Sequence, residues 1–133
     1  MRDLLKVLIV TAAALLVTYA AVILRGDTSV AVPPPESVAE QFARLVAAGR
    51  YDRALQHVEE WSGITHVAVR LAGDRLRERA GAVEHVAGEP GQIAGDIATA
   101  SAVLVTEREG RVRFSLQLRR QRGVWKIVKW QID

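Results

Sequence analysis

An uncharged apolar segment near the N-terminus most constrains what this chain of 133 residues can form. The stretch Val7 to Leu24, VLIVTAAALLVTYAAVIL, runs for 18 residues without a charge, and two preceding leucines extend it to the length of a helix that crosses a bilayer. A buried core helix is disfavoured, because nothing later in so short a chain could surround it on all sides. We therefore expect residues 1–26 to form a transmembrane anchor.

The charges beside this segment predict its orientation. Arg2 and Lys6 precede it, whereas only Arg25 follows it closely. Because basic residues are retained on the cytoplasmic side, we expect a single-pass protein of the cell membrane with a cytoplasmic N-terminus and an exported C-terminal domain. The alternative is a cleaved signal peptide, since Ser29-Val30-Ala31 has the small-x-small form of a cleavage site.

The rest of the chain divides into a short tether and one domain. Residues 27–35 end in three consecutive prolines, which favour a stiff, extended spacer. Residues 36–133 contain no cysteine, so the domain must be stabilised by a single modest core without disulfides. The formal net charge of +3 is spread along the chain, which is too little to predict nucleic-acid binding.

Hydrophobic periodicity changes from helical to alternating near Gly81. Ser37 and Glu40 have the spacing of a capping box at the start of the first helix. Helices followed by strands indicate an α+β domain, in which three helices cover one face of an antiparallel sheet. The expected elements are helices over 37–49, 51–58 and 64–81 and strands over 82–87, 93–106, 111–119 and 124–132. The apolar face expected for the third helix comprises Ile64, Val67, Ala68, Leu71 and Leu76.

Three stretches resemble one superfamily. They are PESVAEQF at 35–42, GRYDRA at 49–54 and Gly-Val-Trp-Lys-Ile at 123–127. Together they are similar to the nuclear-transport-factor-like, cystatin-like superfamily, and within it to small bacterial proteins that carry such a domain behind a membrane anchor. Over residues 34–133 the resemblance implies a strongly bent sheet that wraps a long helix and forms a cone with an open mouth.

The closing strand, 124–132, is apolar on both faces at strand spacing. One explanation is that one face packs inside the cone while the other meets a second copy or a partner. The other is that a bulge shifts the alternation, so that Trp125, Ile127 and Trp130 all face inward. The sequence leaves both explanations open.

Enzymes of this superfamily place a His or a pair of acidic residues inside the cone, but the inward positions expected on the 111–119 strand are apolar. His57, His66 and His85 have no neighbour at metal-ligand spacing. We therefore expect no catalysis, no metal and no cofactor. The candidate residues for the cone lining or an interface are Phe42, Trp61, Phe114, Trp125, Ile127 and Trp130. The candidate basic face comprises Arg111, Arg113, Arg119 and Arg120.

These features favour a non-catalytic, membrane-tethered interaction domain, an accessory or assembly subunit of a bacterial envelope complex. Its expected partners are the membrane and either another protein or a second copy of the chain. One alternative is a module that binds a lipid or an apolar small molecule in the cone. Another is an enzyme of the same superfamily, because a fold alone does not fix a function.

Overall fold

The computed structural model describes residues 32–133, of which Pro33–Asp133 form one compact unit. The predicted anchor at 1–26 and most of the predicted tether lie outside the described residues. Within the described part of the chain, no helix is long and apolar enough to span a membrane. The elements are α3 (Pro35–Ala47), α4 (Tyr51–Leu55), α5 (His66–Ala80), β1 (Val83–Ala94), β2 (Ile97–Thr106), β3 (Gly110–Gln121) and β4 (Val124–Ile132).

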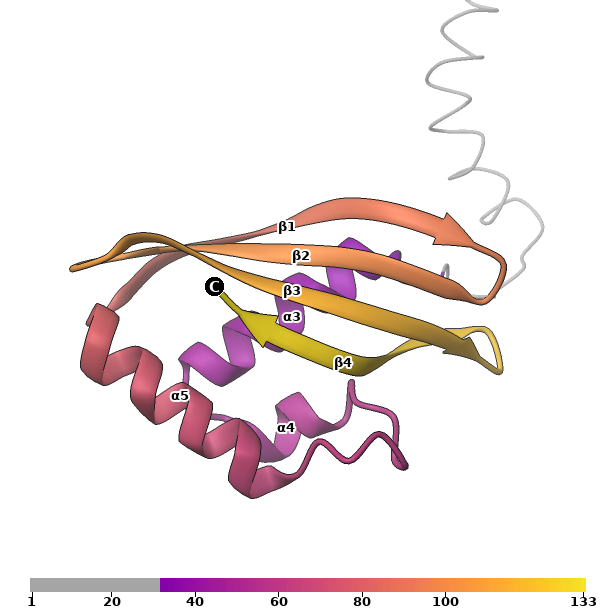
Figure 1. Ribbon diagram of the computed structural model, residues 1–133, viewed down its shortest axis with the longest axis horizontal. Coiled ribbons are helices and arrows are strands. Elements are labelled where there is room, and N and C mark those ends of the chain that lie inside the picture. The colour runs from indigo at the N-terminus through magenta and orange to yellow at the C-terminus, as the bar shows by residue number, and fades with distance from the viewer. Residues whose placement is uncertain (1–31) are drawn as a thin grey trace, which may run out of the picture. The chain divides into compact units, whose positions relative to one another are not determined.

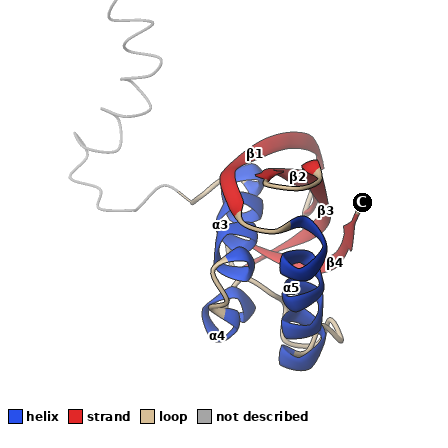
Figure 2. Ribbon diagram, turned by 90° about the vertical axis from the view of Figure 1, so that its left-hand side faces the viewer, coloured by secondary structure: helices blue, strands red, loops and turns tan. Residues whose placement is uncertain are grey.

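The strands form one antiparallel sheet in the order β1-β2-β3-β4, so each strand pairs with the next along the chain (Figure 1). The sheet curves over α3, and α5 lies beside that helix (Figure 2). We call the face of the sheet that packs against α3 the inner face and the opposite face the outer face. Three helices and an antiparallel meander confirm the predicted α+β class.

The first two strands differ from the sequence prediction. We expected strands over 82–87 and 93–106, but β1 continues to Ala94 and a turn at Gly95 and Asp96 separates it from β2. Gly95 has a φ of 63°, the left-handed conformation that short hairpin turns demand. Pro90 suggests a break in the sequence, yet β1 lies at the edge of the sheet, where a residue without an N–H group is tolerated.

Helix α3 begins earlier than predicted and without the capping box. Pro34 occupies the N-cap position with no side-chain cap, and Pro35 is the first helical residue. Proline is favoured there because its missing N–H would have no partner within the helix. Ser37 therefore lies inside the first turn, where its backbone N–H donates to the Pro34 carbonyl at 3.0 Å. The Glu40 side chain does not cap the helix and instead accepts a hydrogen bond from Gly88.

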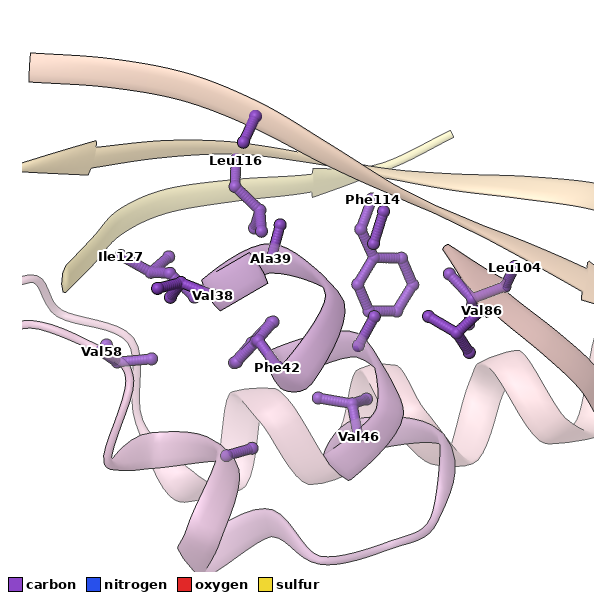
Figure 3. Close-up of a cluster of buried hydrophobic side chains, with 14 of the residues drawn as sticks. Val38, Ala39, Phe42, Val46, Val58, Val86, Leu104, Phe114, Leu116 and Ile127 are labelled. Carbon is purple, nitrogen blue, oxygen red and sulfur yellow. The ribbon is translucent and has the colours of Figure 1, made fainter. Parts of the chain in front are cut away.

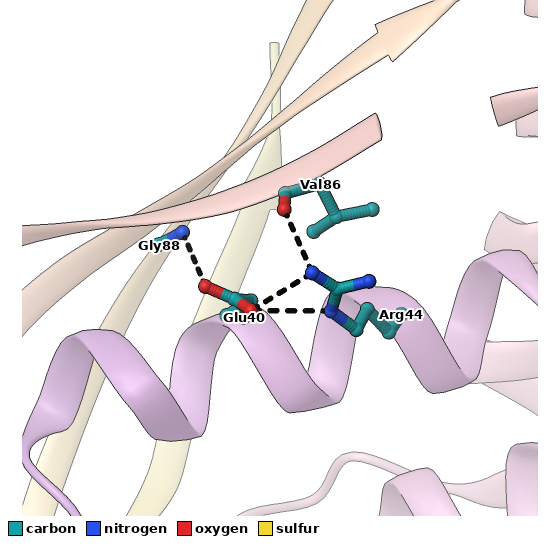
Figure 4. Close-up of polar contacts among 4 residues, drawn as sticks. All are labelled: Glu40, Arg44, Val86 and Gly88. Atoms are coloured by element: carbon teal, nitrogen blue, oxygen red, sulfur yellow. Dashed lines mark hydrogen bonds and ion pairs between the residues drawn. The ribbon is translucent and has the colours of Figure 1, made fainter. Parts of the chain in front are cut away.

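Glu40 and Arg44 of α3 bind the backbone at the free edge of β1 (Figure 4). The Gly88 N–H donates to Glu40 Oε1 at 3.0 Å, and Arg44 Nη2 donates to the Val86 carbonyl at 3.1 Å. Arg44 Nη2 also pairs with Glu40 Oε2 at 2.9 Å. A Cβ on Gly88 would lie 2.2 Å from the Glu36 carbonyl oxygen, so only glycine permits this approach. The two side chains thus cover one edge of the sheet.

The core lies between α3 and the inner face of the sheet (Figure 3). Phe114 and Leu118 of β3 alternate with exposed residues, which confirms the predicted period of two on that strand. Burial of each large apolar side chain contributes roughly 1.5–3 kcal/mol. The largest side chains that are almost wholly buried are Phe42, Val46, Val69, Leu104, Val112, Phe114, Leu118 and Ile127.

A register shift in β4 explains why this strand is apolar on both faces. Ile127 pairs with Leu118 and Lys129 pairs with Gln117, so Val128 is an extra residue between them. Such a bulge reverses the alternation that follows it. The structure therefore matches the second explanation, in which Trp125, Ile127 and Trp130 all lie on the inner face.

Helix α5 is rotated relative to the sequence prediction, which placed its apolar face on Ile64, Val67, Ala68, Leu71 and Leu76. The side chains of Val67 and Leu71 are instead 61% and 48% exposed, whereas Val69 and Gly73 are buried. A Cβ on Gly73 would come within 2.8 Å of the Tyr51 ring. The helix thus packs its smallest residue against the tyrosine and leaves two larger apolar residues outside.

Candidate interaction surfaces

Three of the predicted lining residues form an aromatic cluster that fills the space between α3 and the sheet. Phe42 and Phe114 have no exposed surface, and their ring centroids are 6.4 Å apart. Trp130 stands edge-on to both rings, at 5.3 Å from Phe42 and 5.7 Å from Phe114. Since these rings occupy the interior, they stabilise the fold and do not line an open cone.

Trp125 and Ile127 also belong to the core, with 5% and 0% of their surfaces exposed. Trp61 does not join them. Its side chain is 87% exposed on the loop between α4 and α5, so it does not line the interior, and its place in an interface stays a prediction. No apolar surface of the described domain covers the indole.

The predicted basic face is largely neutralised by ion pairs. Arg113 Nη1 lies 2.7 Å from Glu89 Oε1 on β1, and Arg119 Nη1 lies 3.5 Å from Glu59 Oε1. Among the described residues no ion pair forms on Arg111. Strand spacing alone places all three arginines correctly on the outer face, but it does not show the acidic partners that come from other elements.

Arg120 was wrongly assigned to that face. It pairs with Trp125 across β3 and β4, and its guanidinium carbon lies 5.3 Å from the centre of the Trp125 ring. Its Nη2 is 3.2 Å from Asp96 in the β1–β2 turn. Arg120 therefore covers the rim of the core through a cation–π contact.

A cleft of about 610 Å³ opens beside the exposed Trp61. Behind it, the chain segment His57–Glu59 pairs with β4. The Glu59 N–H donates to the Ile127 carbonyl, and the Ile127 N–H donates to the His57 carbonyl, both at 2.8 Å. The cleft is lined by Glu59, Glu60, Trp61, Gln121, Arg122, Val124 and Lys126.

Glu59 is the functional candidate that sequence reasoning missed, because two adjacent glutamates near a helix end are typical of solvated carboxylates. Only 9% of the residue is exposed, and its Oε2 has no hydrogen-bond partner among the described residues. A buried carboxylate oxygen without a donor is costly, which marks Glu59 as a functional candidate. The short parallel pairing with β4 that buries it cannot be read from the local sequence.

The histidines lie apart from one another. His66 Nε2 lies 3.1 Å from Asp52 Oδ1, while His85 is exposed on β1. His57 is partly buried, and burial together with the positive charge of Lys126 lowers its pKa from the ordinary value of 6.5. Within residues 32–133, no three acidic or histidine side chains gather into a metal-ligand set.

Tyr51 is the centre of a polar network that joins α4 to α5. Its hydroxyl donates to Asp74 Oδ1 at 3.1 Å and accepts from Arg77 Nη2 at 2.5 Å. Arg77 Nη2 also lies 2.6 Å from Asp74 Oδ1. The hydrogen bond to Tyr51 is the main cause that raises the pKa of Arg77. Every member of the network has a partner, which is typical of a structural contact that fixes the rotation of α5.

Comparison with solved structures shows a nuclear-transport-factor-like fold. A protein from Campylobacter jejuni described as an NTF2-like transpeptidase is similar with a TM-score of 0.54 at 14% identity, over 71% of this chain and 97% of that one. A SEC-C motif containing protein from Rhodopseudomonas palustris is similar with a TM-score of 0.52 at 15% identity, over 84% of this chain and 86% of that one. No protein-family model matches the chain, and the curated proteins give no significant match. At these identities the likeness shows the fold alone, so the fold expected from the PESVAEQF, GRYDRA and Gly-x-Trp-Lys-Ile stretches is confirmed.

Proposed function

We propose that this chain is a non-catalytic interaction domain, held at the membrane by its N-terminal segment, which serves as an accessory or assembly subunit of a bacterial envelope complex. The observation that carries the proposal is the aromatic cluster of Phe42, Phe114 and Trp130. Because these rings fill the interior, the surface is what remains for binding. The apolar sequence of residues 7–24 supports the tether.

Trp61 supports a protein partner in particular. Tryptophan is enriched among the few residues that supply most of the binding energy of protein interfaces. The indole is 87% exposed beside a cleft, so its burial by a partner would make the free energy of binding more favourable. We therefore expect the surface around Trp61 to be part of the partner contact.

Site-specific photo-cross-linking in native membranes tests this function. A benzophenone amino acid is placed at residue 61, at residue 75 on α5, or at the exposed residue 92 on β1 as the matched control. We expect a protein product from residue 61 or residue 75 that residue 92 does not give, and loss of the co-purified partner in Trp61→Ala if the product comes from residue 61. Identical patterns at all three positions, or no protein product at any of them, would contradict the proposal.

A second candidate function is the binding of a small molecule at the cleft beside Trp61, rather than in the cone interior. The buried Oε2 of Glu59, which has no partner within residues 32–133, favours it. A ligand with a planar group would stack on Trp61, and its hydrogen-bond donor would satisfy that oxygen once the Glu59 carboxylate turns toward the cleft. Saturable quenching of Trp61 emission by such a compound, abolished in Glu59→Gln, would establish this function in place of the first.

A further inference from the structure

The backbone at the two edges of the sheet makes different contacts. Glu40 and Arg44 bind the Gly88 N–H and the Val86 carbonyl at the edge of β1. At the other edge, the segment His57–Glu59 pairs with β4 only at Ile127. An unpaired strand edge is a template for another strand, and these contacts occupy the edge of β1 at Val86 and Gly88 and the edge of β4 at Ile127.

The second half of β4 presents its backbone outward. The N–H and C=O groups of Ile127 bond to the 57–59 segment and so point away from β3, whereas the Asp133 N–H donates to the Arg113 carbonyl at 2.9 Å. Backbone groups alternate along a strand, so those of Trp130 and Ile132 point away from β3. Among the described residues, no strand or bridge pairs with this stretch.

A groove lies between this part of β4 and α5. It has a volume of about 200 Å³ and is lined by Ile132 together with Ala72, Arg75, Leu76 and Arg79 of α5. The half-exposed Leu71 precedes Arg75 by one helical turn. The groove thus combines apolar side chains with two arginines, and it lies beside a strand edge at which the backbone groups of Trp130 and Ile132 point outward.

We propose that Trp130–Ile132 and this groove bind an extended, acidic segment of a partner protein, which adds to the sheet as a fifth strand. Backbone hydrogen bonds to Trp130 and Ile132 would supply affinity, and the α5 side chains would supply specificity, as in other cases of strand addition. The proposal rests on the proposed function and names the chemistry of its partner.

Charge decides between an acidic partner and a second copy of the chain. The charged residues that line the groove are Arg75 and Arg79, of which Arg79 already pairs with Glu109. Among the described residues no carboxylate pairs with Arg75. A second copy would bring the same arginines to its own groove, whereas carboxylates on an incoming strand would meet them favourably.

The test measures amide hydrogen exchange of the full chain in detergent, with and without a defined peptide. The peptide is acetyl-Thr-Glu-Val-Glu-Val-Glu-Thr-amide, and the control peptide carries N-methyl groups on alternate amides. At saturation we expect exchange of the Trp130 and Ile132 amides to slow about tenfold or more with the first peptide only. Arg75→Glu should weaken peptide binding about tenfold, whereas the matched change Arg70→Glu, on an exposed residue outside the groove, should not.

Each other outcome overturns the proposal. Peptide binding without protection of these two amides would place the site elsewhere. Protection that depends on protein concentration and not on peptide would make a second copy the occupant. Failure here is separable from failure of the proposed function, because photo-cross-linking at residue 61 reports a partner whether or not β4 accepts a strand.

Discussion

The rings of Phe42 on α3 and Trp130 on β4 meet edge to face, with centroids 5.3 Å apart and planes at 88°. This contact joins the first and last elements of the described domain. Trp130, a candidate for the cone lining or an interface, therefore lies on the inner face. The bulge at Val128 places the indole there.

Replacement of Trp130 by alanine should therefore destabilise the fold. We expect Trp130→Ala and Phe42→Ala each to lower the free energy of unfolding by about 3–5 kcal/mol, because each leaves a cavity among the remaining rings. Phe42→Leu should cost less, since it retains most of the volume. Urea titration followed by circular dichroism measures these changes. A Trp130→Ala domain of unchanged stability would show that the indole is not part of the core.

Gly73→Ala should destabilise the domain although alanine is the better helix former. Propensity alone predicts a gain of about 1 kcal/mol. The new Cβ would come within 2.8 Å of the buried Tyr51 ring, which Asp74 and Arg77 hold in place, so we expect a net loss of about 1–3 kcal/mol. A double-mutant cycle with Tyr51→Ala checks the cause, because the loss at Gly73 should disappear when the ring is absent. An equal loss in both backgrounds would point to a different contact.

Glu40 should make the stability of the domain depend on acid pH. The Gly88 N–H and then Arg44 lower its pKa below the ordinary value of 4.5. This contribution to stability is present above pH 4.5 and is lost as the pH falls through the lowered pKa of the folded state. Glu40→Gln keeps an oxygen acceptor for Gly88 but does not titrate. Unfolding titrations between about pH 3 and pH 6 should give a shallower slope for the variant, and an unchanged slope would contradict the role of this contact.

His57 should add a second pH dependence at higher pH. Its pKa is lowered from 6.5 by burial and then by Lys126, so the folded state disfavours the protonated form. Stability is complete above pH 6.5 and declines as the pH falls from there through the lowered pKa. We expect His57→Gln to remove this decline between about pH 5 and pH 7, as measured by thermal unfolding. Replacement of the exposed His85 provides the control for loss of a histidine.

The elements that were predicted correctly are those set by residues close together in the sequence, such as alternating apolar residues in a strand and glycines at helix ends. The alternation of Val112, Phe114, Leu116 and Leu118 correctly placed β3 and its buried face. Gly81 correctly marked the change from helix to sheet, and Gly49 the end of the first helix. The superfamily resemblance of the chain correctly predicted the fold.

Contacts between distant residues account for what the sequence could not show. The rotation of α5 depends on Tyr51, more than twenty residues before Gly73, and the burial of Glu59 depends on Ile127 of β4. The hairpin at Gly95 was missed because residues 93–106 were interpreted as one strand, whereas β1 ends at Ala94 and β2 begins at Ile97. Candidate surfaces likewise arise where separate elements meet, such as α5 and β4 at Ile132.

Aromatic side chains fill the interior of the domain, which is why we propose that the domain acts through its surface. The most direct measurement is a titration of the Trp61→Phe variant with an apolar probe such as naphthalene, followed by NMR signals of Phe42, Phe114 and Trp130. A filled interior predicts no saturable change at these three residues. Saturable shifts at one-to-one stoichiometry would contradict the claim and make the interior a ligand-binding cavity.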